Sequence, residues 1–295
     1  MNRNTLIIFF LISFQVFSQD SKINADSIAL SKLNKKYKSV EKLANELTKG
    51  LSNDSIKFRV MFKWIALNIT YDYTLKNHST KTILRKKNAI CSGYSSLLKE
   101  MCDITNINCV KIEGMAKGDF SKLKGMGTEH SWNAVLINNT WRLCDVTWSA
   151  VYREKNKIIK EYYDIYYMMN PELFALRHYP NDKKWLLTDM KKRTYKKQPI
   201  FFYNYFEIQK GLNFKTSIKK SMKGDSFIVD IDKKIIDEEK MLIKVYDGYN
   251  KVVIPKKFYI NENRVRLIFD VSFIKVKSSV LLTYNNNEVL GFFWK

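Results

Sequence analysis

Hydrophobic residues in the first third of the chain recur at helical spacing. Residues 39–50 form a short helical pattern, for which Ser39 is an N-cap candidate. A longer helix is predicted from Asp54, because apolar residues recur every three or four positions at Phe58, Met61, Phe62, Ile65, Ala66 and Ile69. A mostly polar stretch, residues 76–87, separates it from a third amphipathic helix that begins at or next to Cys91.

Alternation of apolar and polar residues replaces the helical spacing further along the chain. Residues 109–113 alternate, and the strand-like runs 131–137 and 140–148 flank Asn138-Asn139. Two such residues between two strands are a strong signal for a β-hairpin. The sequence therefore predicts helices followed by a hairpin, which we assign to a domain over residues 19–195.

Short alternating runs dominate from about residue 200. Turn residues such as Gly224-Asp225 and Asp247-Gly248 separate them, and the runs themselves are 227–231, 241–246, 252–254, 265–269, 280–284 and 289–294. Several short strands within about 90 residues are typical of a β-sandwich. We therefore predict a second domain, residues 200–295, of immunoglobulin-like β-sandwich type.

The first 18 residues have the form of a secretory signal peptide. Arg3 gives a positive start, an apolar run of about a dozen residues follows, and Ser18 offers a small residue for cleavage. An uncleaved anchor is the alternative, but the run is shorter than the roughly 20 residues of a spanning helix. No later segment reaches 18 consecutive apolar residues. We predict a mature chain that is secreted or periplasmic and has no membrane span.

The composition describes a basic globular protein. Of the 295 residues 45% are hydrophobic, which supplies a core, and the formal net charge is +22. Lysine pairs recur along the whole chain and no nucleic-acid-reading motif accompanies them, so no specific nucleic-acid partner is predicted. We interpret the charge as a solvated surface that an anionic cell envelope could attract.

The four cysteines show no disulfide framework or metal site. The spacing of Cys91, Cys102, Cys109 and Cys144 fits no common zinc pattern, and no calcium-binding loop is visible. Neither a metal nor a cofactor is therefore predicted. Buried core thiols are the default interpretation of the last three, and a Cys102–Cys109 disulfide stays open.

Cys91 is the candidate nucleophile because it opens a helix. The backbone N–H groups and the helix dipole at that end stabilise a thiolate and can form an oxyanion hole. The alternative interpretation is a buried structural cysteine, which is common in protein cores. On the position of Cys91 alone, the structural role is the favoured interpretation.

The hairpin adds a base and a carboxylate. In a turn centred on Asn138-Asn139, His130 faces Thr147, and His130 and Asp145 become diagonal neighbours on one face. Their backbones are then about 7–8 Å apart, within reach of a His–Asp hydrogen bond. Nothing in this pairing brings Cys91 to His130.

Three motifs in this order resemble the transglutaminase-like superfamily. They are Cys91-Ser-Gly-Tyr before a helix, His130-Ser-Trp-Asn, and Trp141-Arg-Leu-Cys-Asp145-Val-Thr-Trp148. The segment 170–187, with Asn-Pro-Glu and His-Tyr-Pro, resembles more particularly the kyphoscoliosis-peptidase-like bacterial secreted proteins. The resemblance covers about residues 38–190 and implies an α+β, papain-like catalytic domain.

The resemblance also implies a Cys–His–Asp triad. Cys91 would be the nucleophile, His130 the base that takes the thiol proton, and Asp145 the carboxylate that orients the imidazole. The residues proposed to bind substrate are Trp132 and Trp148, as walls of the site, and Tyr71, as a further oxyanion donor.

The leading hypothesis is a secreted thiol enzyme that acts on peptide or amide bonds of a protein or peptide substrate through an acyl-enzyme. Water as acceptor gives a cysteine peptidase or amidase, and an amine gives a transglutaminase. We favour hydrolysis, because a site exposed to bulk water transfers to water unless the amine is specially bound. The alternative is a non-catalytic cell-surface or periplasmic binding module on the same scaffold, which the basic surface and the appended β domain motivate.

Overall fold

The computed structural model describes residues 24–72, 74, 76–118, 127–154, 157–198, 200–202, 215–217, 220–221, 224–232, 241–246, 251–253, 256–261, 264–270, 278–285 and 287–294. The predicted signal peptide lies outside these residues. The chain divides into two compact units: the first is Met1–Gly114, Glu129–Phe174 and Pro180–Leu187, and the second is Met115–Thr128, Ala175–Tyr179 and Thr188–Lys295. Within the described ranges no helix has the length and apolar character needed to cross a membrane.

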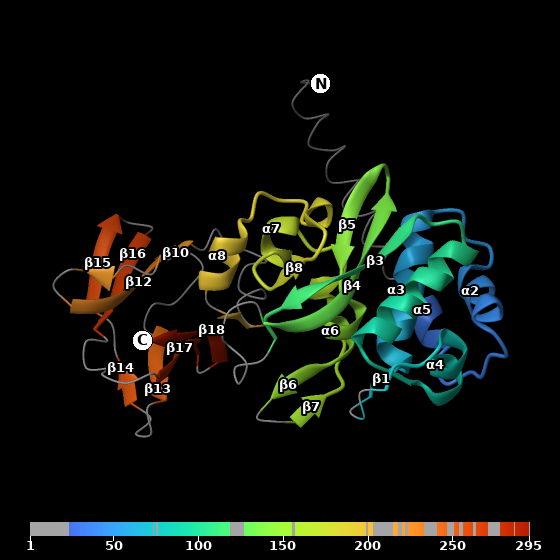
Figure 1. Ribbon diagram of the computed structural model, residues 1–295, viewed down its shortest axis with the longest axis horizontal. Helices are drawn as coiled ribbons and strands as arrows, with labels where there is room; N and C mark the ends of the chain where they lie inside the picture. The colour runs from blue at the N-terminus through green and yellow to red at the C-terminus, as the bar shows by residue number, and fades with distance from the viewer. Residues whose placement is uncertain are drawn as a thin grey trace, which may run out of the picture. The chain divides into compact units, whose positions relative to one another are not determined.

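Four labelled helices open the first unit, after a short helix over residues 24–31. They are α2 (Val40–Thr48), α3 (Asp54–Asn68), α4 (Thr80–Lys86) and α5 (Cys91–Ile104). Figure 1 shows these four helices grouped together beside the strands of the unit's main sheet. The three predicted helices correspond to α2, α3 and α5, and the Ser39 hydroxyl caps α2 by accepting the Lys42 N–H at 3.1 Å.

Helix α4 lies inside the stretch 76–87, which was expected to be a polar connection. The Ser79 hydroxyl accepts the Thr82 N–H at the start of α4, and Lys87 ends the helix in a left-handed conformation with φ 58°. Only Ile83 and Leu84 are buried in α4. Two buried positions are too few to produce a periodic apolar stripe, so the sequence pattern did not reveal the helix.

The main sheet has the strand order β5-β4-β3-β8. Its strands are β3 (Cys109–Ala116), β4 (Thr128–Ile137), β5 (Thr140–Cys144) and β8 (His178–Pro180). The predicted hairpin is confirmed: β4 and β5 pair antiparallel from Ile137–Thr140 to Asn133–Cys144. Asn138 and Asn139 take φ values of 50° and 57°, which a tight hairpin turn of type I′ requires.

The strand predicted over 140–148 is too long. β5 ends at Cys144, and α6 (Val146–Ala150) begins two residues later. The reason is local, since the Asp145 carboxylate caps α6 and so ends the extended conformation. The remaining elements of this half are β1 (Thr70–Tyr71), β2 (Asn88–Ala89), β6 (Tyr152–Glu154), β7 (Lys157–Ile159), η2 (Asp164–Tyr166), α7 (Pro171–Phe174) and η3 (Lys183–Trp185).

A single hydrophobic core joins the helices of the first unit. Large side chains from α3 and α5 are fully buried in it, among them Phe58, Phe62, Trp64 and Tyr94. The Tyr94 hydroxyl donates to the Ile69 carbonyl at 2.7 Å, so its polar end is satisfied. This packing fixes the first turns of α5 against the end of α3.

The second unit contains two antiparallel sheets, with strand orders β10-β12-β16-β15 (β11 also pairs with β12) and β14-β13-β17-β18-β9. The predicted runs lie in β12, β13, β14, β16, β17 and β18, whereas the packing of the two sheets as a β-sandwich stays a prediction. The bounds are α8 (Lys192–Lys197), β9 (Ile200–Phe201), β10 (Lys215–Ser217), β11 (Lys220–Ser221), β12 (Gly224–Asp232), β13 (Met241–Tyr246), β14 (Lys251–Val253), β15 (Lys256–Asn261), β16 (Arg264–Asp270), β17 (Ser278–Tyr284) and β18 (Asn287–Trp294).

Candidate active site

Cys91 is the first residue of α5, as the sequence predicted. Ile90 occupies the N-cap position, and no side chain caps the helix there. The first backbone N–H groups of a helix have no acceptor within the helix and lie at the positive end of its dipole. Cys91 begins the helix at this end and is only half-buried, so the residue stays partly accessible.

Two short strands fix the chain that enters α5. β1 runs parallel to β2, with Tyr71 opposite Ala89, and the Asp72 N–H donates to the Ala89 carbonyl at 2.9 Å. Tyr71 is therefore held beside the residue that precedes Cys91 by two positions. Its side chain is half-buried and packs against the core.

Gly93 allows close packing of this helix start. A Cβ atom at Gly93 would lie 2.7 Å from Ile83 Cδ1 and 2.9 Å from Ala89 Cβ. Both distances are shorter than side-chain contacts in a packed interior. The glycine thus lets α5 approach α4 and β2.

The end of the hairpin brings His130 and Asp145 together. The His130 Nε2 atom lies 2.6 Å from Asp145 Oδ2. The other carboxylate oxygen, Oδ1, accepts the backbone N–H groups of Thr147 and Trp148, each at 3.0 Å. Asp145 is fully buried. The N-terminus of α6 therefore orients the carboxylate, which in turn orients the imidazole.

The imidazole of His130 connects this pair to Cys91. The His130 side chain and the backbone N–H of Ser131 both act on the Cys91 thiol and lower its pKa. Because Nε2 faces Asp145, Nδ1 is the ring nitrogen that can reach the sulfur. The structure thus joins His130 to Asp145 by a hydrogen bond and brings His130 near enough to Cys91 to act on its thiol.

The electrostatics of this chain favour a charge-separated pair. Burial opposes the thiolate, but the hydrogen bond and charge of His130 and the Ser131 N–H outweigh it and lower the pKa of the Cys91 thiol. Burial also opposes the imidazolium, yet the Asp145 carboxylate beside it raises the pKa of His130 to about 10. Both shifts act in the direction of a Cys91 thiolate beside a His130 imidazolium.

Two tryptophans lie against the imidazole. The Trp148 ring stacks on His130 with centroids 4.9 Å apart, and the Trp132 ring centroid lies 6.2 Å from it. Trp148 is half-buried, whereas Trp132 has only 1% of its surface exposed. Trp148 therefore has exposed surface that can face a substrate, whereas Trp132 is packed inside the protein.

The other three cysteines are buried free thiols, as their default interpretation expected. A hydrogen bond with Cys109, together with burial, raises the pKa of the Cys102 thiol well above its ordinary value. Burial does the same to the pKa of Cys144. Protonated buried thiols are poor nucleophiles, so Cys91 is the cysteine suited to chemistry.

Ser131 is the contact to Cys91 that the sequence did not reveal. Its contribution comes from the backbone N–H, and a backbone donor leaves no mark in residue type. Of the two other histidines, His178 is buried in β8, and the His78 Nε2 atom lies 3.5 Å from an Asp72 carboxylate oxygen.

Comparison with known proteins gives the site a family context. The family model of the transglutaminase-like superfamily matches residues 41–146. Kyphoscoliosis peptidase of Mus musculus is 29% identical over 160 residues, which cover 50% of this chain and 24% of that protein, and the Homo sapiens protein gives the same values. Hillarin of Drosophila melanogaster is 26% identical over 195 residues, covering 59% of this chain and 24% of hillarin. The chain spans about a quarter of the length of these relatives.

The matched residues 41–146 contain the start of α5, the hairpin and the cap of α6, and hence Cys91, His130 and Asp145. They also contain the helices and strands of a mixed α/β, papain-like fold. The resemblance drawn from the three sequence motifs is thereby confirmed, and residues 41–146 carry a transglutaminase-like superfamily domain related to that of kyphoscoliosis peptidase.

Proposed function

We propose that the protein is a thiol enzyme that cleaves peptide or amide bonds through a covalent acyl-enzyme. The observation that carries this proposal is the hydrogen bond between His130 and Asp145 beside Cys91, a thiol whose pKa His130 lowers. A lowered thiol pKa, an adjacent imidazolium and a helix N-terminus together activate a cysteine nucleophile. Relatives named as peptidases support the same reaction class.

In the first half-reaction the Cys91 thiolate attacks the carbonyl carbon, and the carbonyl π electrons move onto oxygen. The N–H groups at the start of α5, with Tyr71 as a further donor, stabilise this oxyanion. The C–N bond then breaks, and the His130 imidazolium gives its proton to the departing amine. A thioester on Cys91 and a neutral His130 remain.

In the second half-reaction water attacks the thioester while neutral His130 takes its proton. Collapse of the tetrahedral intermediate breaks the C–S bond and releases a carboxylic acid, and the thiolate and imidazolium are restored. Asp145 keeps Nε2 protonated and stabilises the positive ring in both half-reactions. Trp148 forms the wall of the site that faces the substrate.

Hydrolysis is the proposed outcome, since Cys91 and Trp148 are both partly exposed and water can reach the thioester. An amine acceptor at the same step would make an amide instead and give a transglutaminase. The two outcomes differ by product mass when a glutamine peptide is supplied with methylamine. A methylamide as the main product would replace the peptidase proposal by transamidation.

The pH dependence of Cys91 alkylation tests the thiolate–imidazolium pair. We expect iodoacetamide to modify Cys91 well below the ordinary thiol pKa of about 8.5, because His130 holds the thiol pKa low. In His130→Ala the rate should fall about tenfold per pH unit below the thiol pKa, as for a free thiol. Peptide mass spectrometry distinguishes Cys91 from the three buried cysteines.

The same experiment separates the enzyme from the alternative, a non-catalytic binding module whose second domain recognises the ligand. An ordinary alkylation profile for Cys91, unchanged in His130→Ala, would favour the binding module. An enzyme also predicts hydrolysis that declines above about pH 10, where His130 loses the proton that it gives to the amine, while alkylation of the thiolate continues.

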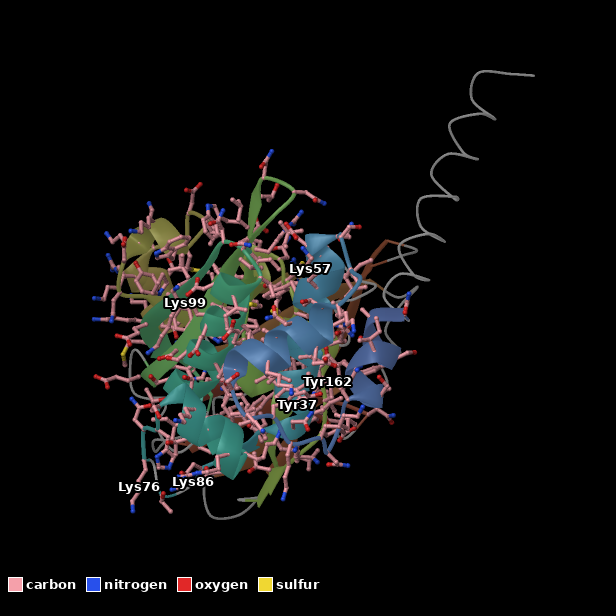
Figure 2. All side chains as sticks on the ribbon, turned by 90° about the vertical axis from the view of Figure 1, so that its right-hand side faces the viewer. Tyr37, Lys57, Lys76, Lys86, Lys99 and Tyr162 are labelled. Carbon is pink, nitrogen blue, oxygen red and sulfur yellow. The ribbon has the colours of Figure 1, made fainter. Side chains whose placement is uncertain are left out.

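We further propose that the protein is exported and meets an anionic envelope surface. The net charge of +22 supports this partner, and Figure 2 shows Lys86 of α4, Lys99 of α5 and Lys76 of the loop before α4 at the outside of the molecule. Binding to vesicles of anionic phospholipid should weaken steeply between 50 and 500 mM salt, because exposed charges are screened within about 10 Å at 0.1 M. Equal binding to neutral vesicles would contradict the proposal.

A further inference from the structure

We propose that Arg59 is a positioning residue for Asp145 and Trp148, acting through residues 162–169, which we name the bridging segment. The inference rests on the proposed function for the role of the positioned residues. Its test reads the chemical state of Cys91 and does not require turnover.

The backbone of the bridging segment holds the chain on both sides of Asp145. Three hydrogen bonds do so: Tyr163 N–H to Ser149 carbonyl at 2.8 Å, Asp145 N–H to Tyr166 carbonyl at 3.0 Å, and Met169 N–H to Leu143 carbonyl at 2.9 Å. They attach the segment to the end of β5, to the cap of α6 and to the body of α6. The bridging segment therefore fixes the position of the Asp145 backbone, from which the carboxylate extends.

The bridging segment also contacts the aromatic wall of the site. The Tyr166 and Trp148 rings meet edge to face, with centroids 5.4 Å apart. Trp148 in turn stacks on the His130 imidazole. A displacement of the bridging segment would thus change the position of the His130 imidazole in two ways, through Asp145 and through Trp148.

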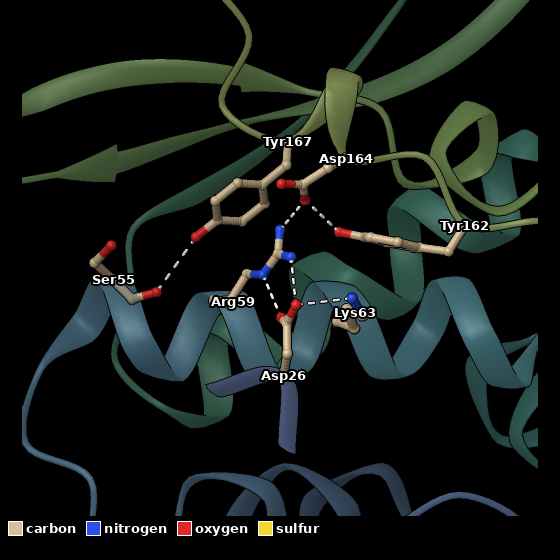
Figure 3. A network of polar contacts seen from close by, with 7 residues as sticks. All are labelled: Asp26, Ser55, Arg59, Lys63, Tyr162, Asp164 and Tyr167. Atoms are coloured by element: carbon tan, nitrogen blue, oxygen red, sulfur yellow. Dashed lines mark hydrogen bonds and ion pairs between the residues drawn. The ribbon is translucent and has the colours of Figure 1, made fainter. Parts of the chain in front are cut away.

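The opposite side of the bridging segment is tied to α3 by the buried guanidinium of Arg59, as Figure 3 shows. One arm of Arg59, Nη1, forms an ion pair with the Asp164 carboxylate. Nε and Nη2 bind the two oxygens of Asp26 at 2.6 and 2.9 Å. The Tyr162 hydroxyl donates to the same Asp164 oxygen at 2.7 Å.

Aromatic packing surrounds this ion pair. The Arg59 guanidinium lies over the Tyr167 ring at 4.6 Å, and the same ring packs on Phe58 and Phe62 of α3, with centroids 5.8 and 5.2 Å away. The charged group is therefore desolvated and bound on several sides. Asp26 and Asp164 hold Arg59 positive, and their hydrogen bonds raise its pKa despite the burial.

A network of this kind specifies geometry more than it adds stability. The desolvation of a buried ion pair offsets much of its attraction, so its net contribution is small, whereas loss of one partner leaves a buried charge uncompensated. A guanidinium binds two carboxylates in fixed directions, which an ammonium cannot do. Arg59 thus sets the distance and angle between α3 and the bridging segment.

Arg59→Lys tests this role. The lysine keeps the positive charge but lacks the planar guanidinium that binds two carboxylates in fixed directions. We expect the pH midpoint of Cys91 alkylation to move upward, toward that of His130→Ala, and kcat for any amide substrate to fall about tenfold to a hundredfold with little change in KM. Asp164→Asn, which acts on the bridging segment itself, should shift the alkylation midpoint in the same direction. It keeps the test available if Arg59→Lys fails to fold.

Lys57→Met is the matched control. Lys57 also lies on α3 and pairs with Asp54 at 3.0 Å, and among the described residues no hydrogen bond, ion pair or ring contact joins it to the bridging segment. We expect the alkylation profile to stay unchanged and the urea midpoint to move little, because an exposed ion pair adds little stability. The inference is overturned if folded Arg59→Lys and Asp164→Asn lose stability and leave the alkylation midpoint at the wild-type value. If the midpoint moves in a protein that hydrolyses no substrate, the positioning role stands and the proposed function fails.

Discussion

Cys91→Ser should reduce amide hydrolysis by about four orders of magnitude or more, with little change in folding stability. The serine hydroxyl stays protonated at neutral pH, so the pair with His130 loses its charge separation and the attacking atom is a poor nucleophile. The side chain is half-buried at a helix start, where serine is also a suitable residue. Initial rates with a peptide substrate, together with a urea unfolding curve, measure both quantities.

Cys102→Ala provides the control for this change. Cys102 lies near the other end of the same helix and is fully buried. Its replacement should lower stability by about 1 kcal/mol through lost packing and leave the rate unchanged. EDTA should also leave the rate unchanged, since the proposed chemistry uses side chains alone. Loss of activity with EDTA that calcium restores, or a Cys91→Ser enzyme of near-normal rate, would contradict the mechanism.

The hairpin shows how far the sequence determines this site. The Asn138-Asn139 turn correctly predicts the register of β4 and β5, and therefore the approach of His130 to Asp145. The predicted reason was incomplete, because Asp145 lies beyond the ladder, at the cap of α6. A carboxylate after a strand is compatible with a continuing strand and with a helix cap. Here the Asp145 side chain caps the helix by accepting the Thr147 and Trp148 N–H groups, which the residue type alone does not report.

The proximity of Cys91 and His130, unlike the hairpin, could not be predicted from a local sequence pattern. Helix α5 and strand β4 are separated along the chain by β3 and by residues 117–127, and no local pattern reports their distance. The motif resemblance supplied that expectation, and the lowered pKa of the Cys91 thiol, to which His130 contributes, is consistent with it. The role of Arg59 could not be predicted from the sequence for the same reason. Its partners, Asp26 and Asp164, are 33 and 105 residues away along the chain.

Asp145→Asn separates the two roles of the Asp145 carboxylate, which caps α6 and orients the His130 imidazole. The amide oxygen can still accept the Thr147 and Trp148 N–H groups, so the cap of α6 should survive. The amide nitrogen, however, donates toward Nε2 and forces the ring proton onto Nδ1, the nitrogen that must take the thiol proton. A histidine held in this wrong tautomer costs about four orders of magnitude in kcat. Initial rates and the alkylation profile of Cys91 measure the loss.

The pH dependence of stability gives the same variant a second readout. In the wild type the pKa of His130 is about 10 in the folded chain, against about 6.5 when unfolded. A raised folded pKa means that its stabilisation is complete below about pH 6.5 and is lost as the pH rises through about 10. The difference in unfolding free energy between wild type and Asp145→Asn should therefore be larger at pH 6 than at pH 10.

Asp145→Ala removes both tasks at once and should destabilise the first unit by about 3–5 kcal/mol. It leaves the buried imidazole without its carboxylate, which is the larger effect, and two helix N–H groups without an acceptor, which adds about 1 kcal/mol. An alanine variant as stable as Asp145→Asn would show that the cap contributes nothing and that other contacts begin α6. A variant that retained the rate would show that His130 is oriented by another group, and the chain from Cys91 to Asp145 would no longer explain the chemistry.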